Sequence, residues 1–478
     1  MSKRMYDTND IFGEKTLANG SQCKLVSAPG PFRRRSAARR ADMGRGHATF
    51  ALLCLARGAF GSDMVPKPFG HEMLADFTMD PEYINLNHGS YGSVPKYVQA
   101  AQSKWREVTE LNPDLFFRYT VYDDLFVARS AVAKYVNADP EDVVFVENAS
   151  EGMNAILQSL LVSGSGLLYL DLAYGMVQET LRYIQDTEGV SLSKVATDDL
   201  FPIASKEDFE SALVAKVRAA LAVDSSLNRC SFSHITSIPA LILPIVELSQ
   251  ACHDAGATVI VDGAHALGQI PPDIPALGVD VYVSNGHKWL YTPKGSAFLW
   301  VTPALQGSSD PYTRGNNVYP VVISNEGQGE SDYAKLFSYE GTKDYSNWLA
   351  FPAALDWRAN YTQGEEEVMD YIHSLAVSGG DLLAEAWNSS VLMPSELIGA
   401  MVNVELPTTN CTKAGALSKE LIDHYHTYVP TFGKSGGCYV RVSAQIYNDL
   451  SDFSYLAQTV LDLLSEYRDP DGSFWTWM

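Results

Sequence analysis

The sequence contains few of the features that mark membrane, metal-binding or disulfide-stabilised proteins. Its six cysteines are scattered among 478 residues, with no CxxC pair and no zinc-ligand spacing. The apolar run at 48–56 is nine residues long, whereas a helix needs roughly 20 residues to cross a bilayer. No internal repeat or low-complexity tract is present. We therefore expect a soluble, cytoplasmic protein with reduced thiols, no metal and no membrane span.

Lysine and arginine are also scarce, at 35 against 57 acidic residues, which gives a net charge of −22. Nucleic acid and anionic membranes both need a positively charged partner, so neither is expected to bind this protein. The charge is unevenly distributed. Residues 1–63 hold 11 basic and 5 acidic residues, a net of +6, and residues 64–478 hold 24 and 52, a net of −28. We predict that 1–63 is a basic, disordered extension before the folded body.

Helix-like and strand-like segments alternate from residue 95 to about residue 301. Strands separated by helices predict an α/β fold, with a mostly parallel sheet covered by helices on both faces. The predicted strands are 142–147, 167–171, 230–236, 258–262, 281–284 and 297–301. We expect an N-terminal arm and large domain over 64–330, and a smaller α+β domain over 331–478.

Asp262 and Lys288 are the pair of residues that carries most chemical information. Asp262 ends an apolar strand and Lys288 follows the next one, 26 residues later. Both are therefore predicted at the carboxyl edge of the sheet, where open α/β folds bind ligands. An ordinary salt bridge is the alternative interpretation. Pyridoxal phosphate explains both residues, because a lysine amine binds it as a Schiff base and a carboxylate holds its pyridine nitrogen protonated.

The phosphate of such a cofactor needs hydrogen-bond donors of its own. The segment 147–153 ends a predicted strand and opens a predicted helix, whose free N–H groups attract an anion. Ser150 as a simple helix cap is the alternative. Ser284 and His287, which flank the lysine, are further candidate donors. A nicotinamide site is excluded at the only Gly-rich candidate, 163–166, because that segment precedes a strand.

Seven motifs resemble those of the class V aminotransferase family of fold-type I pyridoxal-phosphate enzymes. The similarity is greatest to isopenicillin N epimerase-like proteins, cysteine desulfhydrases and hercynylcysteine sulfoxide lyases, and it covers residues 68–464. The motifs occur in the family's order at 85–92, 148–154, 233–237, 261–265, 285–289, 337–342 and 440–447. The resemblance implies the same fold, with the large cofactor-binding domain and small C-terminal domain described above.

The resemblance also implies a role for particular residues. Those placed around the cofactor are Lys288, Asp262, His265, Tyr174, Ala149, Ser150, Ser284 and His287. Gly341 and Thr342 are expected to reach it from a neighbouring subunit of a homodimer. Arg441 is implied as the clamp for the substrate carboxylate, with Asn87 and His88 on the substrate side. Lys288, Tyr174 and His88 are the predicted catalytic residues.

The leading interpretation is a C–S lyase that releases pyruvate and ammonia from a cysteine conjugate or its sulfoxide, similar to the lyase of ergothioneine biosynthesis. Phe116, Phe117, Tyr119 and Tyr122 around Arg118 could receive a cationic substrate group, or could simply pack a helix start. The alternatives are an epimerase, aminotransferase or ring-forming enzyme of secondary metabolism, and a non-catalytic relative. Desulfuration through a persulfide is disfavoured, since no cysteine lies between Cys252 and Cys411, although Cys438 keeps it open.

Overall fold

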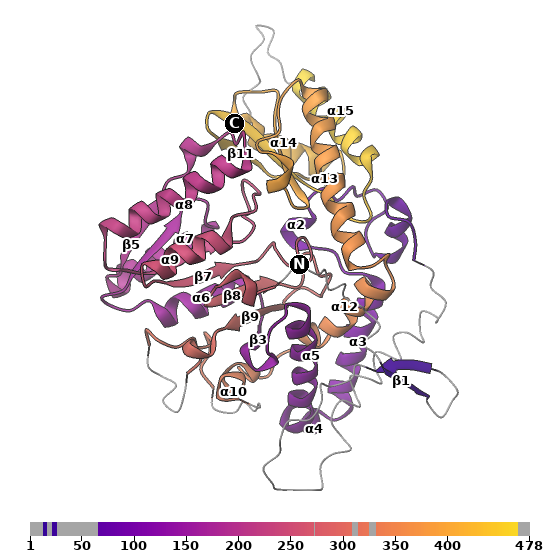
Figure 1. Ribbon diagram of the computed structural model, residues 1–478. Coiled ribbons are helices and arrows are strands. Elements are labelled where there is room, and N and C mark those ends of the chain that lie inside the picture. The colour runs from indigo at the N-terminus through magenta and orange to yellow at the C-terminus, as the bar shows by residue number, and fades with distance from the viewer. Residues whose placement is uncertain are drawn as a thin grey trace, which may run out of the picture.

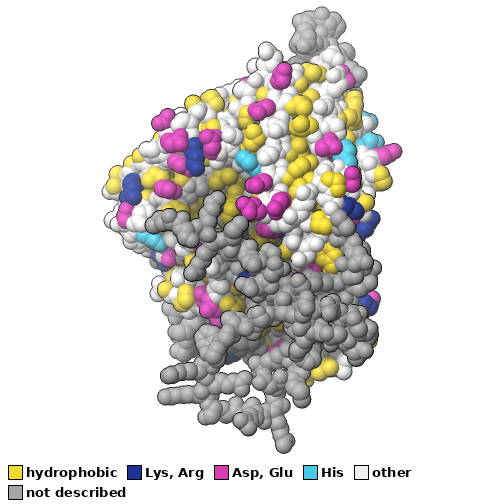
Figure 2. All heavy atoms as spheres, turned by 45° about the vertical axis from the view of Figure 1, so that its right-hand side comes forward, with side chains coloured by type: hydrophobic (Ala, Val, Ile, Leu, Met, Phe, Trp, Pro, Cys, Tyr) yellow, Lys and Arg dark blue, Asp and Glu magenta, His cyan; other side chains and the backbone are white. Residues whose placement is uncertain are grey.

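The structure is a computed structural model that describes residues 66–466 apart from 272, 308–313 and 325–330, together with two short paired strands near the N-terminus (Figure 1). Those strands are β1 (Gly13–Thr16) and β2 (Gln22–Leu25), which run antiparallel. The rest of the predicted extension 1–63 lies outside the described residues. In Figure 2, Asp and Glu side chains spread over the visible face with few Lys and Arg among them, as the net charge of the body requires.

A seven-stranded sheet forms the centre of the large domain, in the order β3-β9-β8-β7-β6-β4-β5. Within this sheet only β9 runs antiparallel to its neighbours. The strands are β3 (Val143–Val146), β4 (Gly166–Leu170), β5 (Ser191–Val195), β6 (Leu227–Ser233), β7 (Thr258–Asp262), β8 (Val281–Asn285) and β9 (Ala297–Val301). The predicted mostly parallel sheet is confirmed, and β5 is the strand that the prediction missed.

Helices cover both faces of this sheet because its strands are apolar on both sides. Val259 and Val261 of β7 enter one core, while Ile260 enters the other. The second core is shared with α6 (Ala149–Leu160) and α7 (Gly175–Glu188), and the first with α8 (Lys206–Val223) and α9 (Ile245–Asp254). Strand residues alternate between faces, so a continuous apolar run is what a doubly covered strand requires. Because both faces are covered by helices, a ligand can reach the sheet only at the edge where these strands end.

The small domain lies beside the large sheet and contains its own antiparallel sheet, in the order β10-β12-β11 (Figure 1). Its strands are β10 (Met401–Glu405), β11 (Thr431–Lys434) and β12 (Gly437–Ser443). Its helices are α13 (Glu365–Trp387), α14 (Cys411–His424) and α15 (Leu450–Glu466). The α+β composition matches the predicted fold class.

The helices just after residue 330 pack with the large domain. They are α10 (Asp332–Ser338), α11 (Ser346–Leu349) and α12 (Phe351–Asn360). Their contacts are with β3, α3 (Lys96–Leu111) and α5 (Val121–Tyr135). Buried aromatic residues hold α11 and α12 there, since the rings of Trp348 and Phe351 both stack on Phe145 of β3. The domain boundary at 330 stays a prediction.

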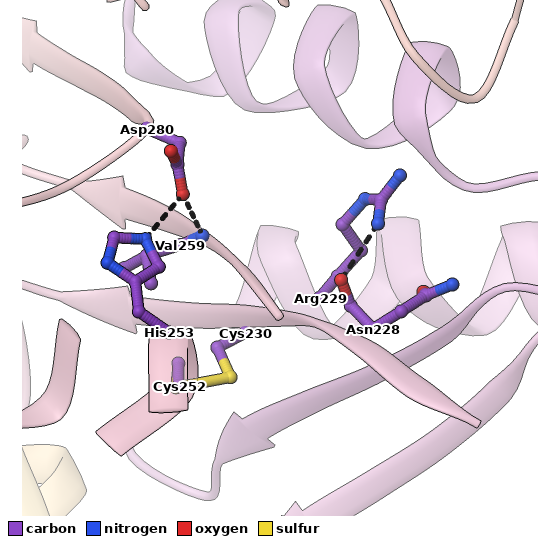
Figure 3. The surroundings of a disulfide bond; sticks show 7 residues. All are labelled: Asn228, Arg229, Cys230, Cys252, His253, Val259 and Asp280. Atoms are coloured by element: carbon purple, nitrogen blue, oxygen red, sulfur yellow. Dashed lines mark hydrogen bonds and ion pairs between the residues drawn. A yellow bond between two sulfur atoms is a disulfide. The ribbon is translucent and has the colours of Figure 1, made fainter. Parts of the chain in front are cut away.

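The prediction of reduced, unpaired cysteines is wrong for four of the six. Cys230 of β6 is bonded to Cys252 of α9 (Figure 3), and Cys411 of α14 is bonded to Cys438 of β12. The partners are 22 and 27 residues apart, and helix-on-strand packing brings them together, which no local spacing rule detects. Among the described residues, no helix is long and apolar enough to cross a membrane.

Candidate active site

Asp262 and Lys288 meet at the carboxyl edge of the large sheet, as predicted. Asp262 is the last residue of β7, and Lys288 lies in the turn after β8, the neighbouring parallel strand. Gly263 follows Asp262, and a Cβ at this position would lie 2.3 Å from the ring of Tyr282. Glycine is therefore required at this turn.

The Lys288 amine is buried and contacts an imidazole. Its Nζ lies 3.1 Å from Nε2 of His265. Burial and, to a smaller extent, the charge of Arg441 lower the pKa of Lys288, while the carboxylate of Asp262 raises it, and together they bring the pKa to about 7. A lysine with such a pKa is partly neutral at neutral pH, which is the form that attacks a carbonyl carbon.

His265 is neutral, and its contacts indicate where its proton lies. Burial and the nearby charge of Lys288 hold the pKa of His265 well below its ordinary value. The indole Nε1–H of Trp289 donates to His265 Nδ1 over 3.5 Å. Because Nδ1 accepts, the ring proton is assigned to Nε2, which faces the lysine amine. The amine then accepts this hydrogen bond in its unprotonated form.

The Asp262 carboxyl is buried, with 6% of the residue exposed. Burial raises its pKa, while the Ala264 N–H, which donates to Oδ1 over 3.0 Å, and the Lys288 charge act against that rise. A buried carboxylate with so few donors gains from a cationic ring N–H. This environment fits a protonated pyridine nitrogen.

The predicted phosphate donors Ala149 and Ser284 lie in two neighbouring segments, the start of α6 and the end of β8. The side chain of Asn285 connects these two segments. Its Oδ1 accepts the Ala149 N–H at the start of α6 over 2.8 Å, while Asn148 caps the same helix by accepting the Glu151 N–H. Ser284 donates to the Gly263 carbonyl over 2.5 Å. An anion held by Ala149 and Ser284 would replace these internal partners. Sequence reasoning missed Asn285, although it stands inside the motif 285–289.

Ser150 and His287 offer the remaining predicted phosphate contacts. Ser150 follows Ala149 in the first turn of α6, where the helix dipole favours an anion. Burial and the charge of Lys288 lower the pKa of His287 to about 4, so this imidazole is neutral. Its Nδ1 bonds with the Ser296 carbonyl over 3.1 Å.

Arg441 reaches the site from the small domain and is held by both domains. On β12 it is 2% exposed. Its Nη1 donates to the carbonyl and hydroxyl of Ser237, and its Nη2 donates to Asn87 Oδ1 over 2.8 Å and to Ser90 Oγ over 2.9 Å. Nε is buried without a partner in the described chain. Burial lowers the pKa of Arg441 to about 10, so it stays charged at neutral pH and can bind a carboxylate.

His88 lies beside this group but contacts the lysine through its backbone. Its Nε2 is 2.8 Å from the Lys288 carbonyl oxygen, and its Nδ1 is 2.8 Å from the Tyr447 hydroxyl. Asn87, predicted on the substrate side, contacts the arginine clamp. Tyr447, Ser90 and Ser237 were not singled out individually, although all three stand within the motifs or directly beside them.

Four predicted residues are not brought into contact with Lys288 within the described chain. Tyr174 precedes α7, is half exposed, and lies close enough for its phenol to affect the Arg441 charge. Arg118 is exposed and pairs with Asp114 over 2.9 Å. Gly341 and Thr342 lie in the loop after α10, where the Thr342 hydroxyl bonds with Tyr339 over 3.4 Å. The roles assigned to these four residues, like those of the other predicted site residues, remain predictions.

The aromatic residues around Arg118 mainly pack against helices. Phe116 is 2% exposed and packs edge-on against Phe117, their ring centres 5.2 Å apart. Tyr119 is exposed, and Tyr122 lines a small cavity with Trp348 and Arg129. This arrangement agrees with the alternative interpretation of a packed helix start.

Comparison with known proteins supports the family. The family model described as aminotransferase class-V matches residues 118–456. L-cysteine desulfhydrase of Arabidopsis thaliana is 28% identical over 437 residues, which cover 84% of this chain and 93% of the relative. Hercynylcysteine sulfoxide lyase of Schizosaccharomyces pombe is 26% identical over 413 residues, 83% of this chain and 98% of the relative.

A solved structure shares the fold. It is a variant of C-DES with glycine covalently linked to its pyridoxal-phosphate cofactor. It superposes with a TM-score of 0.66 at 19% identity, covering 83% of this chain and 100% of that one. Three features of the site fit this cofactor. The buried Asp262 suits its ring nitrogen, the partly neutral Lys288 amine suits its aldehyde, and the N-terminus of α6 suits its phosphate. The chain therefore belongs to the class V aminotransferase family and is a pyridoxal-phosphate-dependent enzyme.

Proposed function

We propose that the enzyme cleaves the Cβ–S bond of a cysteine conjugate or its sulfoxide by β-elimination. The observation that carries the proposal is the pairing of a partly neutral, buried Lys288 amine with a buried Arg441 that has an unused N–H. One group can move a proton at Cα, and the other can hold the α-carboxylate beside it. Such a pair suits an α-amino acid substrate.

The chain's residues divide the work of this reaction. Arg441 binds the substrate carboxylate, since its remaining Nε–H faces no internal acceptor. When bound, pyridoxal phosphate supplies an electron sink for negative charge at Cα. Asp262 holds its ring nitrogen, and the groups at Ala149, Ser150, Ser284 and His287 hold its phosphate. Tyr174 is proposed to stack on the cofactor ring, and His265 to keep its neutral N–H directed at the Lys288 amine.

The bond changes balance without a further reactant other than water. The Cα–H bond breaks and its proton passes to the Lys288 amine. The electron pair left at Cα forms a Cα=Cβ double bond as the Cβ–S bond breaks, and the sulfur leaves with the electron pair of that bond. The enamine that is released hydrolyses to pyruvate and ammonia.

The described cysteines support elimination over transfer through a protein persulfide. Cys438 is three residues from Arg441 on β12, so its side chain points to the opposite face of the sheet. It is also bonded to Cys411. Cys230 and Cys252 are paired and fully buried. None of these four cysteines therefore offers a free thiol to the Lys288 site.

The preferred substrate in this proposal is hercynylcysteine sulfoxide, and the implied pathway is ergothioneine biosynthesis. The relative of that name supports this choice, as does the net charge of the body, which favours a cationic trimethylammonium group. Arg118 is proposed to act on the substrate side.

A substrate panel tests the function. Purified, cofactor-loaded enzyme would be given L-cysteine, S-alkyl cysteines, their sulfoxides and hercynylcysteine sulfoxide, with pyruvate and ammonia measured together. We expect equal amounts of both products, and none from Lys288→Ala. Solvent deuterium entering Cα without pyruvate would instead indicate an epimerase, and cofactor converted to its amine form would indicate an aminotransferase. Either result in place of pyruvate would overturn the lyase proposal.

We also propose a cytoplasmic homodimer. Exposure of Thr342 and of the Tyr174 ring supports sites completed across a subunit interface. Light scattering of the purified enzyme tests the dimer, and a monomer with full activity would exclude it. Cell fractionation tests the cytoplasmic location. The two disulfides argue against that location, because reducing compartments keep thiols unpaired.

A further inference from the structure

A chain of three hydrogen bonds runs from the N-terminal arm through the small domain to the backbone of Lys288. Asn85 Nδ2 donates to the Tyr447 hydroxyl over 2.8 Å. The same hydroxyl lies 2.8 Å from His88 Nδ1, and His88 Nε2 lies 2.8 Å from the Lys288 carbonyl oxygen. Asn85, His88 and Tyr447 are all buried, with 7%, 1% and 1% of each exposed.

Only one arrangement of protons satisfies this chain. The Lys288 carbonyl can only accept, so His88 Nε2 must carry the ring proton. Burial, aided by the charges of Lys294 and Arg358, lowers the pKa of His88 to about 3, so its Nδ1 has no proton and accepts from the Tyr447 O–H. The Tyr447 oxygen then accepts from Asn85. Both ring nitrogens of His88 are therefore committed to the protein.

The residues beside His88 contact the arginine clamp. Asn87 and Ser90 both accept from Nη2 of Arg441. Two glycines of the same segment leave little room for a side chain, Gly92 against the lysine turn and Gly89 against β10 and the ring of Trp289. A Cβ on Gly92 would lie 1.8 Å from the His287 carbonyl oxygen, and one on Gly89 would lie 2.7 Å from Met401 Sδ. This segment, residues 85–92, thus lies wedged between the turn that carries Lys288 and the strand that carries Arg441.

We infer that residues 85–92 set the separation of Lys288 and Arg441, with His88 as a positioning residue for the lysine backbone and Tyr447 as its anchor. This inference rests on the proposed function, in which Lys288 and Arg441 must both contact the same amino-acid substrate. It differs from the catalytic role on the substrate side that the resemblance implied for His88. Tyr447 also links the position of the lysine turn to that of Arg441, because it lies six residues after Arg441 in the segment that continues β12.

The test uses three variants and a control. His88→Ala removes the donor to the Lys288 carbonyl, His88→Gln supplies an amide N–H in its place, and Tyr447→Phe removes the anchor. Tyr97→Phe is the control, because the Tyr97 hydroxyl is equally buried and bonds with Asp356 over 2.6 Å, in helix packing outside the site. Melting temperature and circular dichroism establish that each variant is folded.

The first readout needs neither cofactor nor substrate. In the apoenzyme, the pH dependence of Lys288 labelling by an amine reagent, followed by mass spectrometry, reports the pKa of the amine. A released Lys288 turn lets the amine regain hydration, which raises its pKa from about 7. We expect a rise of about one pH unit in His88→Ala, a smaller rise in Tyr447→Phe and no change in Tyr97→Phe.

The second readout is the kinetics of the loaded enzyme on the substrate identified by the panel. We expect kcat/KM to fall about tenfold in Tyr447→Phe, and His88→Gln to retain more activity than His88→Ala. An unchanged labelling midpoint in a folded His88→Ala variant, or an equal shift in Tyr97→Phe, would overturn the inference. Because labelling precedes any turnover, that failure is distinct from a failure to release pyruvate.

Discussion

The Lys288 amine lies 3.1 Å from Nε2 of His265, and the imidazole in this pair is neutral. Burial lowers the pKa of both groups, and the charge of Lys288 lowers the pKa of His265 further. Trp289 fixes the imidazole from the far side. The site therefore keeps a neutral donor directed at a lysine that is only partly protonated at neutral pH.

The first prediction concerns the pH at which Lys288 reacts. The neutral amine is the nucleophile, and with a pKa of about 7 its fraction rises through neutral pH and is lost below it. The rate at which the apoenzyme captures pyridoxal phosphate should therefore fall tenfold per pH unit well below 7. Stopped-flow absorbance measures this rate. In denaturant the lysine should return to its ordinary pKa near 10.4, and a folded enzyme with that same midpoint would contradict the prediction.

The second prediction concerns Asp262→Asn. Loss of the carboxylate removes the interaction that raises the pKa of Lys288, so the amine should titrate below pH 7. The cofactor should also dissociate more readily, because its ring nitrogen loses an anionic partner. Dialysis followed by cofactor absorbance measures retention. Asp280→Asn is the matched control, since Asp280 lies just before β8 and bonds with His253 and the Val259 N–H, at the end of the strands opposite to Asp262 (Figure 3).

The third prediction separates substrate binding from cofactor binding. Arg441→Lys keeps the charge but loses the planar fork that Ser237 and Asn87 hold in place. We expect KM to rise about 100-fold, which corresponds to loss of a charge-assisted hydrogen bond of 1.5–3 kcal/mol, while cofactor affinity stays within about threefold. Arg229→Lys on β6, whose partners are the carbonyls of Asn228 and Gly315, is the control. An equal rise in KM in both variants would refute the assignment.

The fourth prediction concerns the disulfides. Cys411 is partly exposed, whereas Cys230 and Cys252 are both fully buried. A mild reductant should therefore open the Cys411–Cys438 bond first, as differential alkylation and mass spectrometry would show. Replacing both of these cysteines by serine should lower the free energy of unfolding by about 3 kcal/mol, since the bond closes a loop between α14 and β12. Simultaneous opening of both bonds in folded protein would contradict the assigned burial.

Local pattern was enough to predict the strands that position the site. Asp262 and Lys288 could be placed at one sheet edge because each follows an apolar run, and parallel strands share their carboxyl ends. The contacts of Arg441 with Asn87 could not be predicted in this way, because 354 residues separate them. The disulfides escaped detection for the same reason. Strand β5 was missed because SLSKV lacks the apolar character of an inner strand and lies at the sheet edge.

The last prediction concerns the support beneath the lysine turn. Arg358 of α12 is fully buried and bonds both oxygens of Glu365 over 2.6 Å, the Trp289 carbonyl over 2.7 Å and the Gly268 carbonyl over 3.2 Å. Arg358→Met removes the donor to both carbonyls and leaves the Glu365 carboxylate without its cation, with the Tyr135 hydroxyl still donating to Oε1. We therefore expect the free energy of unfolding to fall by about 3–5 kcal/mol in urea titration. Arg358→Met combined with Glu365→Leu removes the unpaired charge and should recover part of that loss. A double variant as unstable as the sum of the single variants would show that the buried pair does not act as a unit.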